Sequence, residues 1–187
     1  MTYYGGKEMA AAFRTVRNNT IKIAEEIPEN KYDFRASPET RTVQQLLAHI
    51  AVSTGFQSHV HRNRISDMKT LDFPSLFQKF SAEESMPRTK AELIGYLKSE
   101  GDQFAAFLEG LSEDFLAERV TMSPGVEPAT KSRFEMLLSG KEHEMHHRGQ
   151  LMTMQRMMGL VPHITRQMQE RMAQIQAQAA AAGAGQR

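Results

Sequence analysis

Apolar side chains recur along most of this chain at intervals of three and four residues, the spacing of one face of an α-helix. Four segments show the pattern over enough residues to form a long helix. We expect helices over residues 7–27, 43–65, 90–111 and 133–158. No segment alternates apolar and polar residues over a length that would require a strand. The pattern therefore predicts an all-α protein, with these amphipathic helices packed as a four-helix bundle.

Local signals for helix ends support this division. The capping-box pattern precedes three of the helices, as Thr42 with Gln45, Thr89 with Glu92, and Ser132 with Glu135. Gly159 and Pro162 follow the last of the four helices. Glycine favours the backbone conformation of a helix C-cap and proline cannot continue a helix, so we expect this helix to stop at Gly159.

The remaining segments are less regular. Residues 66–88 are mostly polar, and we read them as a crossover loop with at most one short helical turn; loops of this length are often functional or lid-like. A weaker helical pattern at about 163–178 precedes an alanine-rich and glycine-rich end. We therefore expect a bundle domain over residues 1–160. Residues 161–187 should form a helical extension and a disordered tail, packed on the bundle or on a second subunit.

Composition narrows the classes of function. The net charge of the 187 residues is only +1, so no strong field favours nucleic acid or an anionic membrane surface. No run approaches the ~18 apolar residues of a membrane helix, and the N-terminus lacks a signal-peptide core, so a cytoplasmic location is expected. The chain has no cysteine, which excludes disulfides, thiolate ligands and a cysteine nucleophile. Any thiol chemistry would need a thiol from outside.

Histidines interrupt the apolar face of the last long helix. His143 and His147 are four residues apart and share a face with Met136, Gly140, Leu151, Met154 and Met158. His49 lies on the inward side of the second helix, which a bundle would bring against the last one. Three inward imidazoles could hold one divalent ion and leave positions open for water or substrate, as in catalytic rather than structural zinc sites. Nickel and ferrous iron also accept imidazole ligands.

Two other interpretations of these histidines remain open. Each could be an ordinary core histidine with a hydrogen-bonding neighbour. The stretch from His143 to His147 also matches H-E-x-x-H, in which a zinc protease uses the two histidines as ligands and the glutamate as general base. Glu144 would be that base, and Glu170 would be sought as a third ligand. His146 points to another side of the helix, and His59 and His61 have no matching partner in the sequence. These three histidines and His163 are not assigned to the metal.

Three stretches together resemble the DinB/YfiT-like superfamily of metal-binding four-helix bundles. They are Ile27–Pro38, Thr42–Ile50 with its Leu-Leu-Ala-His segment, and His143–Leu151. The resemblance spans about residues 7 to 160. It implies a metal triad of His49, His143 and His147, and a homodimer. Some relatives in this superfamily are metal-dependent transferases of low-molecular-weight thiols.

Three functions follow as hypotheses. The first is a metal-dependent transferase, of the thiol S-transferase type, or a hydrolase, acting on a small molecule through the three-histidine site. The second is a non-catalytic metal-binding and dimerisation module. The third and weakest is an H-E-x-x-H zinc protease with Glu144 as base. The expected cofactor is zinc, nickel or iron, and the expected partners are a small-molecule substrate and a second copy of the chain.

Overall fold

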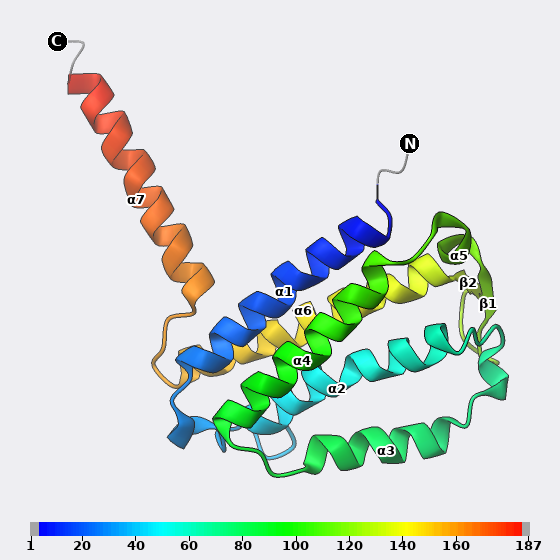
Figure 1. Ribbon diagram of the computed structural model, residues 1–187. Coiled ribbons are helices and arrows are strands. Elements are labelled where there is room, and N and C mark those ends of the chain that lie inside the picture. Colours follow the sequence, from blue (N-terminus) through cyan, green and yellow to red (C-terminus); the bar gives the residue numbers. More distant parts are fainter. Residues whose placement is uncertain (1–3, 185–187) are drawn as a thin grey trace.

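The computed structural model describes residues 4–184, which form a bundle of four long helices with shorter elements around it (Figure 1). The helices are α1 (Gly6–Glu26), α2 (Val43–Arg62), α3 (Phe73–Ser85), α4 (Lys90–Glu109), α5 (Glu113–Ala117), α6 (Arg133–Met157) and α7 (His163–Ala184). Strands β1 (Arg119–Thr121) and β2 (Thr130–Ser132) pair antiparallel, with Val120 opposite Lys131. The predicted all-α class and four-helix bundle are confirmed.

The four long helices α1, α4, α2 and α6 form a ring in that order, so α1 and α2 face each other across the bundle. Helices α1 and α6 run in one direction, and α2 and α4 run in the other (Figure 1). Because the neighbours α2 and α4 are parallel, the chain must return along the bundle between them. Helix α3 makes this return along the outer side of α2.

The predicted helix starts are present. The side chains of Thr42, Thr89 and Ser132 each accept a hydrogen bond from the backbone N–H three residues later, and the reciprocal bonds complete three capping boxes. Helix α6 ends just before Gly159, whose φ of +80° lies in the left-handed region that favours glycine. These local signals therefore set the limits of the two helices that carry the histidines.

The expectation of a loop over residues 66–88 was wrong, because 13 of these residues form α3. The carboxylate of Asp72 caps the helix, and Pro74 lies in its first turn, where a missing N–H costs little. The spacing of the aromatic residues is helical, at Phe73, Phe77 and Phe80. The helix does not contribute to the core, since none of its side chains is buried, and its sequence therefore carries only a weak apolar pattern.

Two other segments differ from expectation. The hairpin of β1 and β2 was not predicted, because three-residue strands are too short to show alternation. Helix α7 continues to Ala184, beyond the predicted end near residue 178, and so takes in part of the expected tail. Residues 185–187 of that tail lie outside the described residues.

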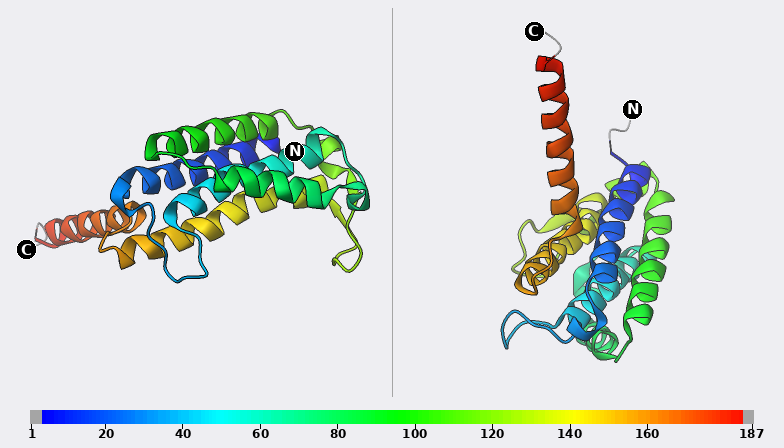
Figure 2. Two further views of the ribbon diagram at one scale, coloured as in Figure 1. Left: turned by 90° about the horizontal axis from the view of Figure 1, so that it is seen from below. Right: turned by 90° about the vertical axis from the view of Figure 1, so that its left-hand side faces the viewer.

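Helix α7 projects away from the bundle and touches it only near its start (Figures 1 and 2). There His163 Nε2 lies 3.0 Å from Asn19 Oδ1, and Arg166 pairs with Glu26 at 2.6 Å. Beyond that turn, α7 exposes Met168, Met172 and Ile175. None of the helices within residues 4–184 combines the length and the hydropathy needed to cross a membrane.

Candidate metal centre

The predicted histidine face of α6 is directed into the bundle. Met136, Gly140, Leu151 and Met154 are buried along it. His147 is 8% exposed and His143 is half-buried. Gly140 allows close packing at this level, because a Cβ there would lie only 3.1 Å from the ring of Phe104 on α4. The imidazoles therefore lie at the inner surface of α6, facing α2.

His49 on α2 meets this pair. Its Nε2 atom lies 3.1 Å from Nε2 of His143, which lies 3.1 Å from Nε2 of His147. One ring nitrogen from each histidine lies within 4.8 Å of the others, and no further histidine or carboxylate within residues 4–184 joins the group. The structure thus brings together all three histidines that the sequence singled out.

Hydrogen bonds on the far side of two rings indicate which nitrogen carries the proton. His49 Nδ1 lies 2.8 Å from Glu84 Oε2, and His147 Nδ1 lies 2.8 Å from Gln150 Oε1. Both partners are acceptors, so each Nδ1 donates and each neutral ring keeps a lone pair on Nε2. Both of these lone pairs point at His143 Nε2. A proton on His143 Nε2 could form a hydrogen bond with only one of them. A cation between the three nitrogens satisfies all of them, and the residues therefore fit a metal ion.

The charge state of the rings also suits a metal ion. Burial, followed by the proximity of His147 and His49, lowers the pKa of His143 to about 4. Burial also lowers the pKa of His147, although the hydrogen bond to Gln150 opposes this. Both rings are therefore neutral near pH 7, which is the form of imidazole that binds metals.

Glu84 on α3 lies directly behind the histidine group and was not identified from the sequence. Its carboxylate accepts hydrogen bonds from His49 and from Arg41, which lies just before α2. Partial burial acts to raise the pKa of Glu84, but the hydrogen bonds from His49 and Arg41, with the charge of Arg41, outweigh it and lower that pKa to about 2. A carboxylate behind a ligand histidine fixes the ring and raises its basicity. The sequence contained no signal for this pairing, because it depends on α3 folding back along α2.

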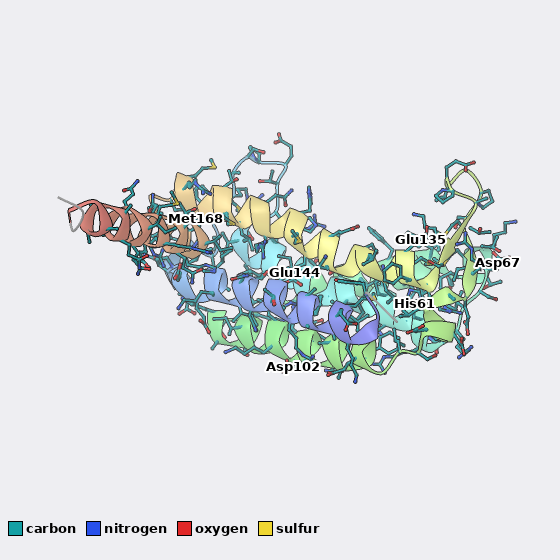
Figure 3. The ribbon with its side chains drawn as sticks, turned by 90° about the horizontal axis from the view of Figure 1, so that it is seen from above. His61, Asp67, Asp102, Glu135, Glu144 and Met168 are labelled. Atoms are coloured by element: carbon teal, nitrogen blue, oxygen red, sulfur yellow. The ribbon has the colours of Figure 1, made fainter. Side chains whose placement is uncertain are left out.

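Glu144 lies on a different side of α6 from the three histidines. Both of its carboxylate oxygens lie 3.0 Å from Nε of Arg17 on α1, and the two side chains are only 1% and 3% exposed. Figure 3 shows Glu144 between α6 and α1. Arg17 also donates to the carbonyl oxygen of Leu97 on α4 at 2.7 Å. Gly101 leaves room for this arginine, because a Cβ there would lie 2.8 Å from Arg17 Cγ.

This ion pair gives Glu144 a structural role and leaves the protease hypothesis without its general base. Glu170, the other residue of that hypothesis, is exposed on the projecting helix α7 and is not part of the histidine group.

None of the other four histidines is part of the group, although the ring of His146 packs edge to face against His147 with centroids 4.8 Å apart. His61 is completely buried, with Nε2 3.2 Å from Gln57 Oε1. His146 contacts the amide nitrogen of Gln150, behind His147. His59 lies beside Asn63, and His163 binds Asn19 on α1.

Two cavities open onto the histidine group. The first, of about 750 Å³, has His147 in its wall together with polar residues such as Arg35, Thr40 and Gln150. The second, of about 560 Å³, has His49 and His143 in its wall and lies between α2, α3 and α6. Arg41 and Glu84 line both cavities, so their ion pair separates the two spaces.

Comparisons with known proteins agree with this architecture. The chain is 24% identical to the uncharacterized protein YjoA of Bacillus subtilis over 152 residues, which cover 81% of this chain and 90% of YjoA. The crystal structure of that DinB-like protein aligns with a TM-score of 0.60, over 81% of this chain and 92% of the other.

Two further solved structures share the fold. YfiT from Bacillus subtilis, described as a probable metal-dependent hydrolase with an unusual four-helix bundle topology, is 13% identical with a TM-score of 0.65, covering 86% of this chain and 91% of its own. The mycothiol-dependent maleylpyruvate isomerase is 14% identical with a TM-score of 0.59, covering 81% of this chain and 63% of its own.

The family assignment comes from the sequence itself. The profile of the DinB superfamily matches residues 12–151, most of the chain and all three histidines of the group. The chain therefore belongs to the DinB superfamily, and its helical bundle and histidine group agree with that assignment.

Proposed function

We propose that the protein binds a divalent metal ion through Nε2 of His49, His143 and His147, and uses it in a transfer or hydrolysis reaction on a small molecule. The observation that carries the proposal is the convergence of the three Nε2 atoms, two of them held as lone-pair donors by Glu84 and Gln150.

A catalytic role is supported by the number of ligands and by access. Structural zinc sites normally have four protein ligands, whereas three ligands beside a cavity leave a position for a reactant. A divalent ion bound here would supply Lewis-acid chemistry, lowering the pKa of a thiol or a water molecule. The residues around it hold the ligand rings in place: Glu84 orients His49, and Gln150 orients His147. Imidazole ligands suit zinc, nickel and ferrous iron alike.

The nucleophile is a low-molecular-weight thiol in the transferase form of the proposal and water in the hydrolase form. The chain has no cysteine of its own, so a thiol must enter from solution. The polar cavity beside His147 is large enough to receive one. YfiT is described as a probable metal-dependent hydrolase and another structural relative depends on mycothiol, and these descriptions support one form each.

A second candidate function is a non-catalytic metal-binding and dimerisation module. The observation that favours it is the exposed apolar surface of α7, formed by Met168, Met172 and Ile175. In this alternative the ion would stabilise the bundle, and α7 would bind a second copy of the chain. The homodimer itself is a proposal in both cases.

The test is elemental analysis of protein purified without an affinity tag, beside His49→Ala and His147→Ala variants. We expect near-stoichiometric zinc, nickel or iron in the natural chain and loss of most of it in both variants. His59→Ala is the matched control, because His59 lies on α2 outside the histidine group. Equal metal content in all four proteins would contradict the proposal.

Activity separates the two candidates. Metal-loaded protein is assayed for conjugation of several thiols to an electrophile and for hydrolysis of small esters and amides. A rate above the free-metal background that is lost in His147→Ala supports the enzyme. Metal binding without any such rate supports the non-catalytic module.

A further inference from the structure

The second cavity carries an inference about the substrate, which rests on the proposed function. We infer that this cavity binds the hydrocarbon part of the substrate, an alkyl or aryl group attached to the group that reaches the three histidines. The cavity holds about 560 Å³ and lies between α2, α3 and α6.

The walls of the cavity are mostly apolar. The residues that make them so are Val52, Phe56, Phe73, Leu76, Phe77 and Phe80. The rings of Phe56 and Phe73 meet edge to face with centroids 6.2 Å apart, and Phe73 stacks near Phe77 at 6.4 Å. Aromatic and aliphatic linings of this kind are typical of sites that bury most of a small ligand.

Helix α3 leaves this surface in contact with water. Phe73 is 55% exposed and Phe77 is 64% exposed, and none of the α3 residues is buried. An amphipathic helix on a globular protein normally buries its apolar face. Here that face borders a cavity, and a hydrocarbon ligand would remove it from water. Gly55 lets α3 lie close to α2, because a Cβ there would come within 3.1 Å of the Phe80 ring.

Two of the polar side chains in the cavity wall, Gln57 and Ser53, already have hydrogen-bond partners within the protein. The amide nitrogen of Gln57 donates to Ser139 Oγ at 2.8 Å, and Ser53 Oγ donates to the carbonyl of Ile50 at 2.9 Å. These two side chains do not require a polar ligand, and the aromatic and aliphatic residues that form most of the wall favour hydrocarbon over a polar group.

The cavity is continuous with the proposed metal site. His49 and His143 are part of its wall, so a ligand group at the histidines and a hydrocarbon in the cavity can belong to one molecule. The ion pair of Arg41 with Glu84 separates this space from the polar cavity beside His147. The substrate is therefore assigned to the apolar side and a polar co-reactant to the other.

The first experiment does not depend on a metal. Metal-free full-length protein is titrated with the neutral fluorophore N-phenyl-1-naphthylamine. Ser81→Leu places a larger side chain at the cavity wall, and Ala82→Leu places the same side chain on the exposed part of α3 outside the lining. We expect at least tenfold weaker binding in Ser81→Leu, several-fold weaker binding in Phe77→Ser, and no change in Ala82→Leu. The buried core is untouched by these substitutions, and circular dichroism verifies the fold.

Two results of that titration would overturn the inference. One is equal affinity in Ser81→Leu and Ala82→Leu. The other is a loss of dye binding as the protein concentration rises, which would indicate that a second copy of the chain occupies the cavity.

The second experiment tests whether a ligand bound to the metal also occupies the cavity. Cobalt-loaded protein is titrated with ethanethiol, butanethiol and hexanethiol, and binding is followed by the sulfur-to-cobalt absorption band. Burial of each methylene should strengthen binding by up to about fourfold, so hexanethiol should bind at least tenfold more tightly than ethanethiol. Ser81→Leu should remove this dependence on chain length and leave the affinity for ethanethiol unchanged.

The outcomes separate the two proposals. If ethanethiol and hexanethiol bind equally, the inference fails while the metal site stands. If cobalt does not bind, the proposed function fails, and the dye titration alone decides whether the cavity takes hydrocarbon.

Discussion

At the centre of the bundle, the guanidinium of Arg17 binds both oxygens of Glu144, and it also donates to main-chain carbonyls of α4 and α2. One side chain of α1 thus contacts the three other long helices. A buried ion pair costs desolvation energy, and removing one partner leaves the other charge without compensation.

Replacing Glu144 with glutamine should therefore destabilise the fold. We expect a loss of about 3–5 kcal/mol in the free energy of unfolding, measured in urea, because the Arg17 charge stays buried without its counter-charge. Metal content of the remaining folded protein should be unchanged. Glu142→Gln is the control, since Glu142 is exposed two residues away. An unchanged stability in Glu144→Gln would show that the pair contributes little.

Because His61 is buried, we expect the stability of the fold to decrease as the pH falls. Burial, and then the charge of Arg133, lower the pKa of His61 to about 4; its other neighbour is Gln57, and Arg133 is paired with Glu118. Between pH 6.5 and pH 4 the unfolded chain binds a proton at His61 and the folded chain does not. The unfolded state is therefore favoured as the pH falls through this range, by a total on the order of 3 kcal/mol.

The measurement is urea unfolding of the natural chain and of His61→Gln at pH 7 and at pH 4.5. Carboxylates contribute to acid destabilisation in both proteins, so the difference between them isolates His61. A loss of stability on acidification that is as large in His61→Gln would contradict the prediction.

The sequence was informative about residues only where helix spacing determines the geometry. His143 and His147 had to share a face, and the apolar neighbours of His49 pointed it inward. Helix spacing does not identify the hydrogen-bond acceptors of these rings. Gln150 is local, three residues after His147, and could have been sought as its acceptor. Glu84 lies 35 residues from His49 and is brought there by tertiary packing alone.

At the scale of elements, α3 is the segment that gives the site its second cavity and the partly buried carboxylate of Glu84. Its last turn is tied to the bundle through Glu84, which binds both His49 and Arg41. Helix α3 thus connects the walls of the cavity to the orientation of a proposed metal ligand.

Replacing Glu84 with glutamine should weaken metal binding. We expect a 10–100-fold loss of affinity, because His49 loses the carboxylate that fixes its ring and raises its basicity. The measurement is competition with a chromogenic chelator. Glu83→Gln is the matched control, because Glu83 pairs with Arg88 and does not touch the histidines. Equal affinities of the two variants would show that Glu84 does not orient His49 for binding.

Elements could be predicted where the apolar stripe was wide and the caps were explicit. Helices α2, α4 and α6 satisfy both conditions, and their starts coincide with the predicted ones. Helix α3 was missed because its few apolar residues stand among many polar ones, and they line a cavity rather than the core. The hairpin of β1 and β2 is held by pairing across a loop, which periodicity does not reveal.

At the scale of the whole molecule, the proposed ion would join α2 to α6, two neighbours in the bundle ring. An ion that binds only the folded chain stabilises it by mass action, by about 4 kcal/mol at a free concentration 1,000 times Kd. Removal of the metal with a chelator should therefore lower the Tm of the natural chain. His49→Ala should show no such change. A chelator effect of equal size in both proteins would mean that the ion binds elsewhere.

Helix α7 should be dispensable for the bundle. Residues 171–182 are exposed, while the contacts of α7 with α1 are made by His163 and Arg166. A chain ending after Glu170 should keep its metal content and its free energy of unfolding to within about 0.5 kcal/mol. Light scattering on the same samples reports the oligomeric state. Loss of a dimer in the shortened chain would show that α7 mediates dimerisation, and a large loss of stability would show that α7 packs on the bundle.

His49 and His143 are separated by 94 residues, yet their ring nitrogens touch. We expect a metal site that joins positions so far apart along the chain to form late, after the folding transition state. Metal binding should then leave the folding rate unchanged and slow unfolding. The metal-bound chain should therefore unfold more slowly than the metal-free chain, although both should fold at the same rate.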